Sequence, residues 1–423
     1  MLDMKFLRAN LDRVREGAEQ KRIEVDLDRL IALDDERKEV LREVEELRNR
    51  KKTAGKEIAK LEGDEKAEAI AALGKIPERV KELDEREKQV VQEIAELAAL
   101  VPQPPDPEVP VGLDDTENVE LRTWGEKPQF EFEPKDHVTL GTELGIIDFP
   151  RAAKLAGSQT YMLVGDGALL ELAVLRYALD TILAEGFVPM ITPTLVRYEP
   201  LYGTAYFPGG EEQAYACEED RLWLTGTSEV PVTAYHMGEV LEADQLPLKY
   251  AGYSSCYRRE AGAAGRDTKG LYRIHQFNKV EQVVICKSDV AESKEHHLSI
   301  LNNSEMVLQG MELPYRVVNV CSGDLGQGQA MKYDIECWMP SRGWGETHSA
   351  SRFYDFQSRR LDLRYRDENG KLQFCHTLNN TVIATPRVLI PILENNQQAD
   401  GSVRIPEVLV PYMGGKTEIR PRH

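Results

Sequence analysis

Apolar residues recur every seven positions through most of residues 27–101. The rows run through Leu33, Val40, Leu47 and Ala54 in the first half and through Ile76, Leu83, Val90 and Leu97 in the second. This spacing is typical of coiled-coil helices. Gly63 and Asp64 supply turn chemistry, Pro77 suits the first turn of a second helix, and PQPPDPEVP after Val101 ends it. Because each apolar row needs a partner, the sequence predicts an antiparallel helical hairpin over about 27–101.

The predicted hairpin is a long arm. With about 25 to 35 residues in each helix, it would extend roughly 40 to 50 Å. Two uses remain open at this point, dimerisation through the coiled coil and contact with a distant ligand. A basic stretch without acidic neighbours in the sequence favours contact with an anion, and its residues are Arg48, Arg50, Lys51, Lys52 and Lys56.

The net charge limits which partners are reasonable. The 423 residues include 53 Lys and Arg against 72 Asp and Glu, a formal net charge of −19. Such acidity argues against a protein that coats DNA or RNA, because that binding requires basic residues. The first 100 residues carry 22 basic and 26 acidic side chains, so most of the excess lies after them. We therefore expect no DNA partner, but a single RNA docked on the arm remains compatible.

The sequence also indicates the compartment. No apolar run approaches the roughly 18 residues of a membrane span, and the first residues lack the apolar centre of a signal peptide. The six cysteines are far apart and form no CxxC pair, which predicts reduced thiols. We expect a cytoplasmic protein without a membrane partner.

After the Pro-rich segment the pattern changes to that of a mixed body. A helical stretch at 169–186 is followed by short β-branched runs such as VEQVVICK, YRVVNVCSG and YDIECWMP. These features predict an α+β fold, with antiparallel strands following the helical hairpin.

Residues 252–281 carry most of the chemistry. Arg258, Arg259 and Glu260 precede a Gly- and Ala-rich loop, and the returning segment carries Phe277 and Glu281. A strand, loop and strand would place these side chains toward one cleft, where arginines hold phosphates and an aromatic ring holds a purine. Surface salt bridges on a hairpin are the alternative. The sequence has no GxxxxGK[ST] loop, so phosphates would be held by arginines and Mg²⁺.

This segment resembles motif 2 of class II aminoacyl-tRNA synthetases, and EAGAAGRDTKGLYRIHQFNKVE resembles the seryl-tRNA synthetase family in particular. Residues 181–196, with Pro193, are similar to motif 1, which lies at the dimer interface in that family. Residues 376–395, with Arg387, are similar to motif 3, and LTGTSEV (224–230) resembles the family's serine-binding loop. The resemblance implies a tRNA-binding domain over 1–105. It also implies a class II catalytic domain over 106–423, built on an antiparallel β-sheet flanked by helices.

The resemblance assigns an ATP site. Its members would be Arg258, Arg259, Glu260, Ile274, Phe277, Glu346, Thr347, His348, Ser349 and Arg387. Of these, Arg258, Glu260 and Arg387 would be catalytic, the arginines holding the α- and γ-phosphates and Glu260 meeting the adenine edge. Glu346 and Ser349 would contact Mg²⁺, which prefers oxygen ligands. The family often has a serine at the place of His348, so we expect no catalytic role for that ring.

The resemblance also assigns a serine site, consisting of Thr227, Ser228, Glu229, Arg258, Glu281, Asn379 and Thr381. Thr227 and Glu229 would receive the ammonium group, while Glu281 and Thr381 would read the hydroxyl. A site that hydrogen-bonds the hydroxyl rejects alanine strongly, since its polar groups would be left unpaired.

The implied activity is an ATP-dependent ligase that forms seryl-adenylate and pyrophosphate and then loads serine onto the 3′ end of tRNA(Ser). The family would also serylate tRNA(Sec), for selenocysteine synthesis, and act as a homodimer. Two alternatives stay open. One is a homologue that loads an amino acid onto a carrier protein, although such relatives lack the long arm. The other is a catalytically inactive tRNA-binding or scaffold protein.

Overall fold

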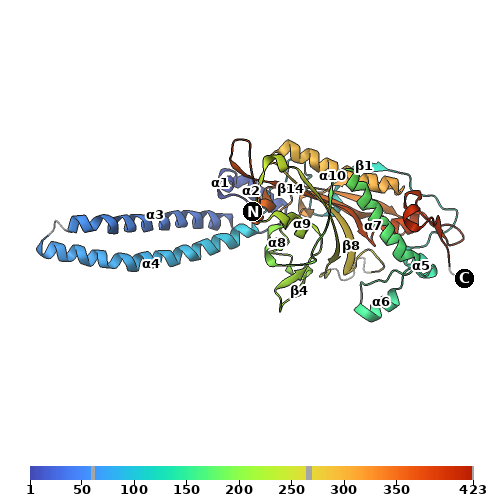
Figure 1. Cartoon of the computed structure of the whole chain (residues 1–423), viewed down its shortest axis with the longest axis horizontal. Coiled ribbons are helices and arrows are strands. Elements are labelled where there is room, and N and C mark those ends of the chain that lie inside the picture. Colours follow the sequence, from blue (N-terminus) through green and yellow to red (C-terminus); the bar gives the residue numbers. More distant parts are fainter. Residues whose placement is uncertain (59–61, 263–268, 422–423) are drawn as a thin grey trace. The chain divides into compact units, whose positions relative to one another are not determined.

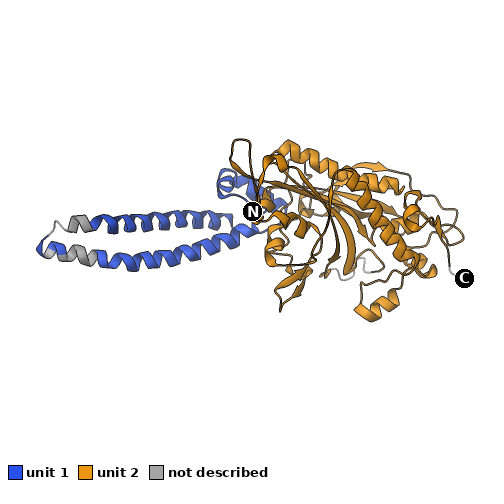
Figure 2. Ribbon diagram, viewed as in Figure 1, with its two compact units in different colours: residues 1–102 blue, residues 103–423 orange. Residues whose placement is uncertain are grey.

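The structure, a computed structural model, describes residues 1–58, 62–262 and 269–421; the side chains of residues 55–58, 64 and 67–72 lie outside the description. It comprises two compact units, residues 1–102 and 103–423 (Figures 1 and 2).

The α-helices are α1 (Met4–Ala9), α2 (Leu11–Gln20), α3 (Leu27–Ile58), α4 (Gly63–Leu100), α5 (His137–Glu143), α6 (Phe149–Ala156), α7 (Asp166–Ala184), α8 (Tyr198–Gly203), α9 (Glu229–Thr233), α10 (Val290–Gly310), α11 (Phe356–Leu361) and α12 (Leu389–Asn395). The strands are β1 (Val119–Trp124), β2 (Val188–Ile191), β3 (Leu195–Val196), β4 (Tyr215–Cys217), β5 (Leu222–Leu224), β6 (Val240–Glu242), β7 (Leu248–Tyr257), β8 (Gln276–Cys286), β9 (Tyr315–Asn319), β10 (Met331–Met339), β11 (Gly343–Tyr354), β12 (Arg364–Arg366), β13 (Leu372–Phe374), β14 (His376–Thr385), β15 (Val403–Arg404) and β16 (Glu418–Ile419).

The first unit contains the helical hairpin, formed by α3 and α4 (Figure 1). Heptad residues from both helices are buried where they meet, among them Val40, Val44 and Leu83. Ion pairs between the helices flank this seam, with Arg29 beside Glu93 at 2.7 Å and Arg86 beside Glu36 at 2.6 Å. The pairing of residue 29 with 93 and of residue 36 with 86 shows that the two helices run antiparallel, as the sequence predicted.

One boundary prediction within the hairpin is wrong. The sequence indicated a second helix starting near Pro77, whereas α4 runs without interruption from Gly63 to Leu100 and contains Pro77. A proline inside a helix removes one hydrogen bond and its ring crowds the carbonyl four residues earlier, at a cost of about 3 kcal/mol. The apolar row continues on both sides of it, through buried Ile76 and Leu83, so packing keeps the helix intact.

The second unit is built on an eight-stranded sheet in the order β1-β9-β10-β11-β14-β8-β7-β2. Its neighbouring strands pair antiparallel except for β2 and β7, which are parallel. Successive side chains along β8 and β14 point to opposite faces of the sheet. Gln282 and Asn380 donate to the Ile300 carbonyl of α10 at 2.9 and 2.6 Å, so residues one position away point to the opposite face.

The Pro-rich segment, apart from Pro102, belongs to the second unit. The Gln103 and Asp106 amides donate to the carbonyls of Gln327 and Ala330 at 2.9 and 2.8 Å. The unit therefore begins at Gln103, slightly before the boundary expected from composition. All six cysteines are unpaired thiols, as the spacing predicted. None of the described helices combines the length and apolar character that a membrane crossing needs.

A buried ion pair anchors this segment. Asp106 pairs with Arg352, whose side chain is 2% exposed, and accepts a hydrogen bond from the Tyr354 hydroxyl at 2.8 Å. We expect Asp106→Ala to lower the free energy of unfolding of the second unit by about 3–5 kcal/mol, because it leaves the Arg352 charge buried without a partner. Glu108→Ala, which removes an exposed partner of Lys294, should cost less than about 1 kcal/mol.

Urea titration followed by tryptophan fluorescence would measure both variants, since all four tryptophans lie in the second unit. Equal destabilisation of the two variants would show that the buried pair has no special role.

Candidate active site

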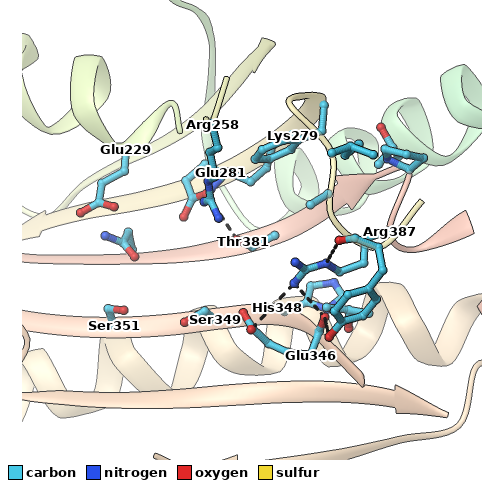
Figure 3. A pocket seen from close by; sticks show the side chains of 18 of the residues that line it. Glu229, Arg258, Lys279, Glu281, Glu346, His348, Ser349, Ser351, Thr381 and Arg387 are labelled. Carbon is cyan, nitrogen blue, oxygen red and sulfur yellow. Dashed lines mark hydrogen bonds and ion pairs between the residues drawn. The ribbon is translucent and has the colours of Figure 1, made fainter. Parts of the chain in front are cut away.

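A cleft of about 970 Å³, including its open mouth, lies on the sheet face opposite α10. This volume suits a small organic ligand or a nucleotide. Figure 3 shows Glu229 at one end, Glu346 and Arg387 at the other, and Arg258 and Glu281 between them. The residues from the sequence prediction that line it are Glu229, Arg258, Glu260, Ile274, Phe277, Glu281, Glu346, Thr347, His348, Ser349, Asn379, Thr381 and Arg387.

The middle of the cleft holds a buried carboxylate faced by hydroxyl groups. Glu281 of β8 and Thr381 of β14 are directly opposite in the strand register. The Glu281 Oε2 atom accepts from the Thr227 and Thr381 hydroxyls at 3.4 and 3.5 Å and pairs with the Lys279 ammonium. Because the two hydroxyl contacts are long, a shorter donor from a ligand can compete for this oxygen.

Glu229 is a second buried carboxylate without a cationic partner in ion-pair contact among the described residues. It accepts hydrogen bonds from the Gln357 amide at 2.9 Å and the Tyr206 hydroxyl at 3.0 Å. Burial and the nearby Glu281 charge raise the pKa of Glu229 to about 7. A bound cation would favour its charged form, so this end of the cleft is suited to an ammonium group.

Arg258 and Glu260 follow the end of β7, and Phe277 lies in β8 opposite Cys256. The Arg258 guanidinium carbon is 5.1 Å from the centre of the Phe277 ring, and its Nε atom donates to the Gly226 carbonyl at 3.4 Å. Glu260 pairs with Arg273 at 3.0 Å. Arg258 therefore presents a half-buried cation beside an aromatic face, which suits a phosphate close to a planar base.

The far end of the cleft combines Arg387 with Glu346. The Arg387 Nη1 atom donates to the Glu346 carbonyl at 3.0 Å and lies 3.8 Å from its carboxylate. The Arg387 Nε atom donates to the Tyr272 carbonyl at 3.2 Å. Burial in the cleft disfavours the charged form of Glu346. The positive charges of Arg387, Lys332 and other cations outweigh this effect and hold the pKa of Glu346 below its ordinary value.

The residues around His348 form the floor. His348 is buried and bonds the Thr347 hydroxyl at 2.8 Å and the Val382 carbonyl at 2.9 Å. Burial lowers the pKa of His348 to about 4, so the ring is neutral and ties two strands together. Ser349 lies opposite Asp334 in the register of β11 and β10.

Several residues of the predicted site lie outside the cleft lining. Thr227 does not line the cleft, but its hydroxyl donates to Glu281 at 3.4 Å and accepts from the backbone N–H of Glu229 at 3.1 Å. The Ser228 hydroxyl donates to the Gly252 carbonyl at 3.0 Å, and Arg259 is exposed and does not line the cleft. In the arm, Arg48 pairs with Asp84 of α4 at 3.2 Å, while Arg50, Lys51 and Lys52 are exposed. The Lys56 side chain lies outside the described residues.

Sequence reasoning missed other members of the cleft. Lys279 shares its face with Phe277 and Glu281, and the alternation of β8 could have identified it. Tyr206, Gln329, Lys332 and Ser351 also line the cleft, but they belong to no recognised motif.

The fold and the site define a class II aminoacyl-tRNA synthetase core. The model of the tRNA synthetase class II core domain (G, H, P, S and T) matches residues 215–396, and that of the seryl-tRNA synthetase N-terminal domain matches residues 1–105. The serine–tRNA ligases of Deinococcus radiodurans and Rubrobacter xylanophilus are 47% and 44% identical, each alignment covering 98% of both chains. The crystal structure of seryl-tRNA synthetase from Pyrococcus horikoshii complexed with ATP is similar over 100% of both chains, with 39% identity and a TM-score of 0.95.

The chain belongs to the seryl-tRNA synthetase family. The resemblance and the α+β fold class inferred from the sequence are thereby confirmed.

The raised pKa of Glu229 predicts a dependence of stability on pH. A carboxyl pKa of about 7 lies above the usual 4.3 or so, so the folded state binds the proton more tightly and loses stability as the pH rises through this window. Glu229→Gln should therefore be more stable than the unchanged protein at pH 8, by about 1–3 kcal/mol, and the difference should shrink at pH 5.

Urea titrations at the two pH values would measure this difference, with the exposed Glu218→Gln as the control. A Glu229→Gln variant that is less stable than the unchanged protein at pH 8 would contradict the burial cost assigned to this carboxylate.

Proposed function

We propose that this chain is an ATP-dependent serine–tRNA ligase. It activates L-serine to seryl-adenylate with release of pyrophosphate, and then transfers serine to the 3′ end of tRNA(Ser). The observation that carries the proposal is the order of groups along the cleft. Glu229, a carboxylate without a cationic partner in ion-pair contact among the described residues, lies at one end; Arg258, Glu281 and Thr381 lie in the middle, and Arg387 lies at the other end. This order matches an amino acid joined to a nucleotide.

Serine would bind at the Glu229 end, with its ammonium group at the Glu229 carboxylate. Its hydroxyl would bond Glu281 and Thr381. Asn379 adds a donor, because its buried Nδ2 atom has no acceptor among the described residues. Thr227 would hold Glu281 in place, and the backbone around Ser228 would shape the wall. Alanine would leave a buried carboxylate unpaired, whereas threonine must be excluded by the size of the pocket.

ATP would bind at the other end. Phe277 would stack on the adenine, Glu260 and the Ile274 backbone would meet the base edge, and Arg387 would hold the γ-phosphate. Arg258 lies between the two ends, where the serine carboxylate attacks the α-phosphorus. Its guanidinium would stabilise the charge that develops as pyrophosphate leaves. Arg259 and Thr347 would support this region, and the neutral His348 would serve structurally.

The floor of the cleft fits Mg²⁺. The Glu346 side chain is about half exposed in the cleft, and Ser349 offers a hydroxyl oxygen. The buried Oδ1 atom of Asp334 has no partner among the described residues. These are the oxygen ligands that a hard cation prefers, and Glu346 and Ser349 would hold it. When bound, Mg²⁺ supplies positive charge to the phosphate oxygens.

The arm would bind the tRNA. Arg50, Lys51 and Lys52 are exposed on α3, and no acidic group of the described residues forms an ion pair with them. Arg48 is partly neutralised by Asp84, and Lys56 extends the stretch in sequence. The proposed partners are tRNA(Ser) and tRNA(Sec), both substrates for serylation.

A homodimer in the cytoplasm completes the proposal. Edge strand β2 exposes apolar side chains, with Val188 54% and Ile191 88% exposed, and Pro193 follows on the same surface segment. An apolar edge of this kind is suited to a second copy of the chain.

Amino-acid-dependent exchange of pyrophosphate into ATP tests the function. We expect exchange with serine and little with alanine or threonine. Thr381→Val should lower kcat/KM for serine roughly 10- to 100-fold, because it removes a hydroxyl from the Glu281 site, and should leave the KM for ATP unchanged. Thr181→Val on α7, which lies outside the cleft, is the matched control.

Exchange with another amino acid and none with serine would refute the proposal. Exchange with no amino acid would favour a catalytically inactive tRNA-binding protein. Transfer of serine to a protein acceptor would favour carrier loading.

The arm has a separate test. The combined variant Arg50→Ala, Lys51→Ala and Lys52→Ala should raise the KM for tRNA about tenfold or more, because phosphates of the RNA are no longer neutralised. The slope of log Kd against log salt concentration should fall by about one for each such phosphate. Serine-dependent exchange should not change. Arg42→Ala, on the same helix beside Glu46, should have little effect.

Normal aminoacylation by the triple variant would refute the RNA role of this stretch. A change in oligomeric state instead would identify the arm as a dimerisation coil.

A further inference from the structure

A buried pair of side chains lies behind the cleft without lining it. Glu394 of α12 is 0% exposed and accepts four hydrogen bonds. Two come from His137, the backbone N–H at 2.9 Å and the ring Nδ1 atom at 2.8 Å. Two come from Ser341, the backbone N–H at 3.0 Å and the hydroxyl at 2.8 Å. Four donors satisfy the carboxylate and fix the imidazole plane.

The other ring nitrogen of His137 contacts the cleft wall. The backbone N–H of Leu271 donates to the His137 Nε2 atom at 3.1 Å. Since an amide N–H can only donate, Nε2 must accept, and the ring proton lies on Nδ1 toward Glu394. The approach also requires a glycine next to Leu271, because a Cβ at Gly270 would lie 2.2 Å from this Nε2 atom.

Leu271 is followed in the sequence by Tyr272, which contacts Arg387, the arginine proposed to hold the γ-phosphate. Its neighbour Tyr272 accepts from Arg387 through its carbonyl at 3.2 Å, and its ring centre lies 4.4 Å from the Arg387 guanidinium. The Tyr272 hydroxyl donates to the Glu346 carbonyl at 3.4 Å. A displacement of Leu271 would therefore change the orientation of Arg387 and its distance from Glu346.

We propose that His137, held by Glu394, is a positioning residue for ATP binding. It links α5 and α12 to the segment that precedes β8, and it fixes Tyr272 and through it Arg387. The residue touches neither substrate, so its effect on the reaction is exerted through the orientation of Arg387. This inference rests on the proposed function, since it assigns ATP to the Arg387 end of the cleft.

Two substitutions separate the two bonds of the ring. In His137→Asn the side-chain amide can reproduce the Nδ1 donor toward Glu394 but leaves Leu271 without an acceptor. In His137→Gln the longer side chain can reproduce the Nε2 acceptor toward Leu271. We expect the Asn variant to raise the Kd and KM for ATP about tenfold, with the KM for serine within about twofold, and the Gln variant to stay within about threefold of the unchanged protein for ATP.

The measurements are calorimetric titration with ATP and serine-dependent pyrophosphate exchange, on the full chain. His296→Asn, which alters a histidine beside Glu292 on α10 and outside the cleft, is the matched control and should leave the affinity for ATP unchanged. Ser341→Ala removes one bond to Glu394 and should raise the Kd for ATP about threefold. It provides the test if the Asn variant does not fold.

Unchanged ATP affinity in the folded Asn variant, or in Ser341→Ala, would overturn the proposal. Equal weakening by Asn and Gln, or an equal decrease in ATP and serine affinity, would also overturn it by indicating a general structural effect. Calorimetry with ATP needs no amino acid, so this result can be read even if serine proves not to be the substrate.

Discussion

The backbone pairing of β8 with β14 is the constraint on which the site depends. Its register sets Glu281 opposite Thr381 and, by alternation, turns Gln282 and Asn380 toward α10. A slip of one residue would exchange these two sets and put the Glu281 carboxylate against a helix. Buried bonds from Gln282 and Asn380 to the Ile300 carbonyl oppose such a slip, so the polar contacts beneath the sheet hold the chemistry above it in place.

Charge is distributed along the cleft at a cost to stability. Glu229 has no cationic partner in ion-pair contact among the described residues, and its raised pKa expresses the free energy needed to keep it charged when the cleft is empty. Glu281 and Glu346 instead have Lys279 and Arg387 beside them. A ligand with an ammonium group at one end and phosphates at the other would compensate both ends together. The arrangement is therefore more complementary to the proposed ligand than to water.

The sequence predicted most of the fold and many of the residues that line the cleft, because the patterns behind these predictions are local. The heptads of α3 and α4 are a local sequence pattern, and their apolar residues can be buried by packing the two helices against each other. The two strands β7 and β8 and the loop between them are also close together in the sequence. Contacts between distant segments were harder. The stretch from Arg48 lacks acids in sequence, yet Asp84 reaches it from the other helix. Pro77 signalled a helix start, but packing on both sides of it preserved the helix.

Sequence patterns also could not identify the residues that hydrogen-bond to the cleft residues from outside the cleft. Gln357 is hydrogen-bonded to Glu229, which lies 128 residues away in the sequence, and His137 is hydrogen-bonded to Glu394, which lies 257 residues away. No spacing rule connects residues so far apart. Lys279 is different, since the period of two along β8 would have placed it with Phe277 and Glu281.

A crystal structure with a non-hydrolysable seryl-adenylate analogue would show whether the cleft holds its ligand in the order inferred for it. We predict the serine hydroxyl within hydrogen-bond distance, about 2.7–3.2 Å, of Glu281, the ammonium group at Glu229 and the adenine against Phe277. An analogue bound in the opposite direction, or with its hydroxyl turned away from Glu281, would contradict this assignment.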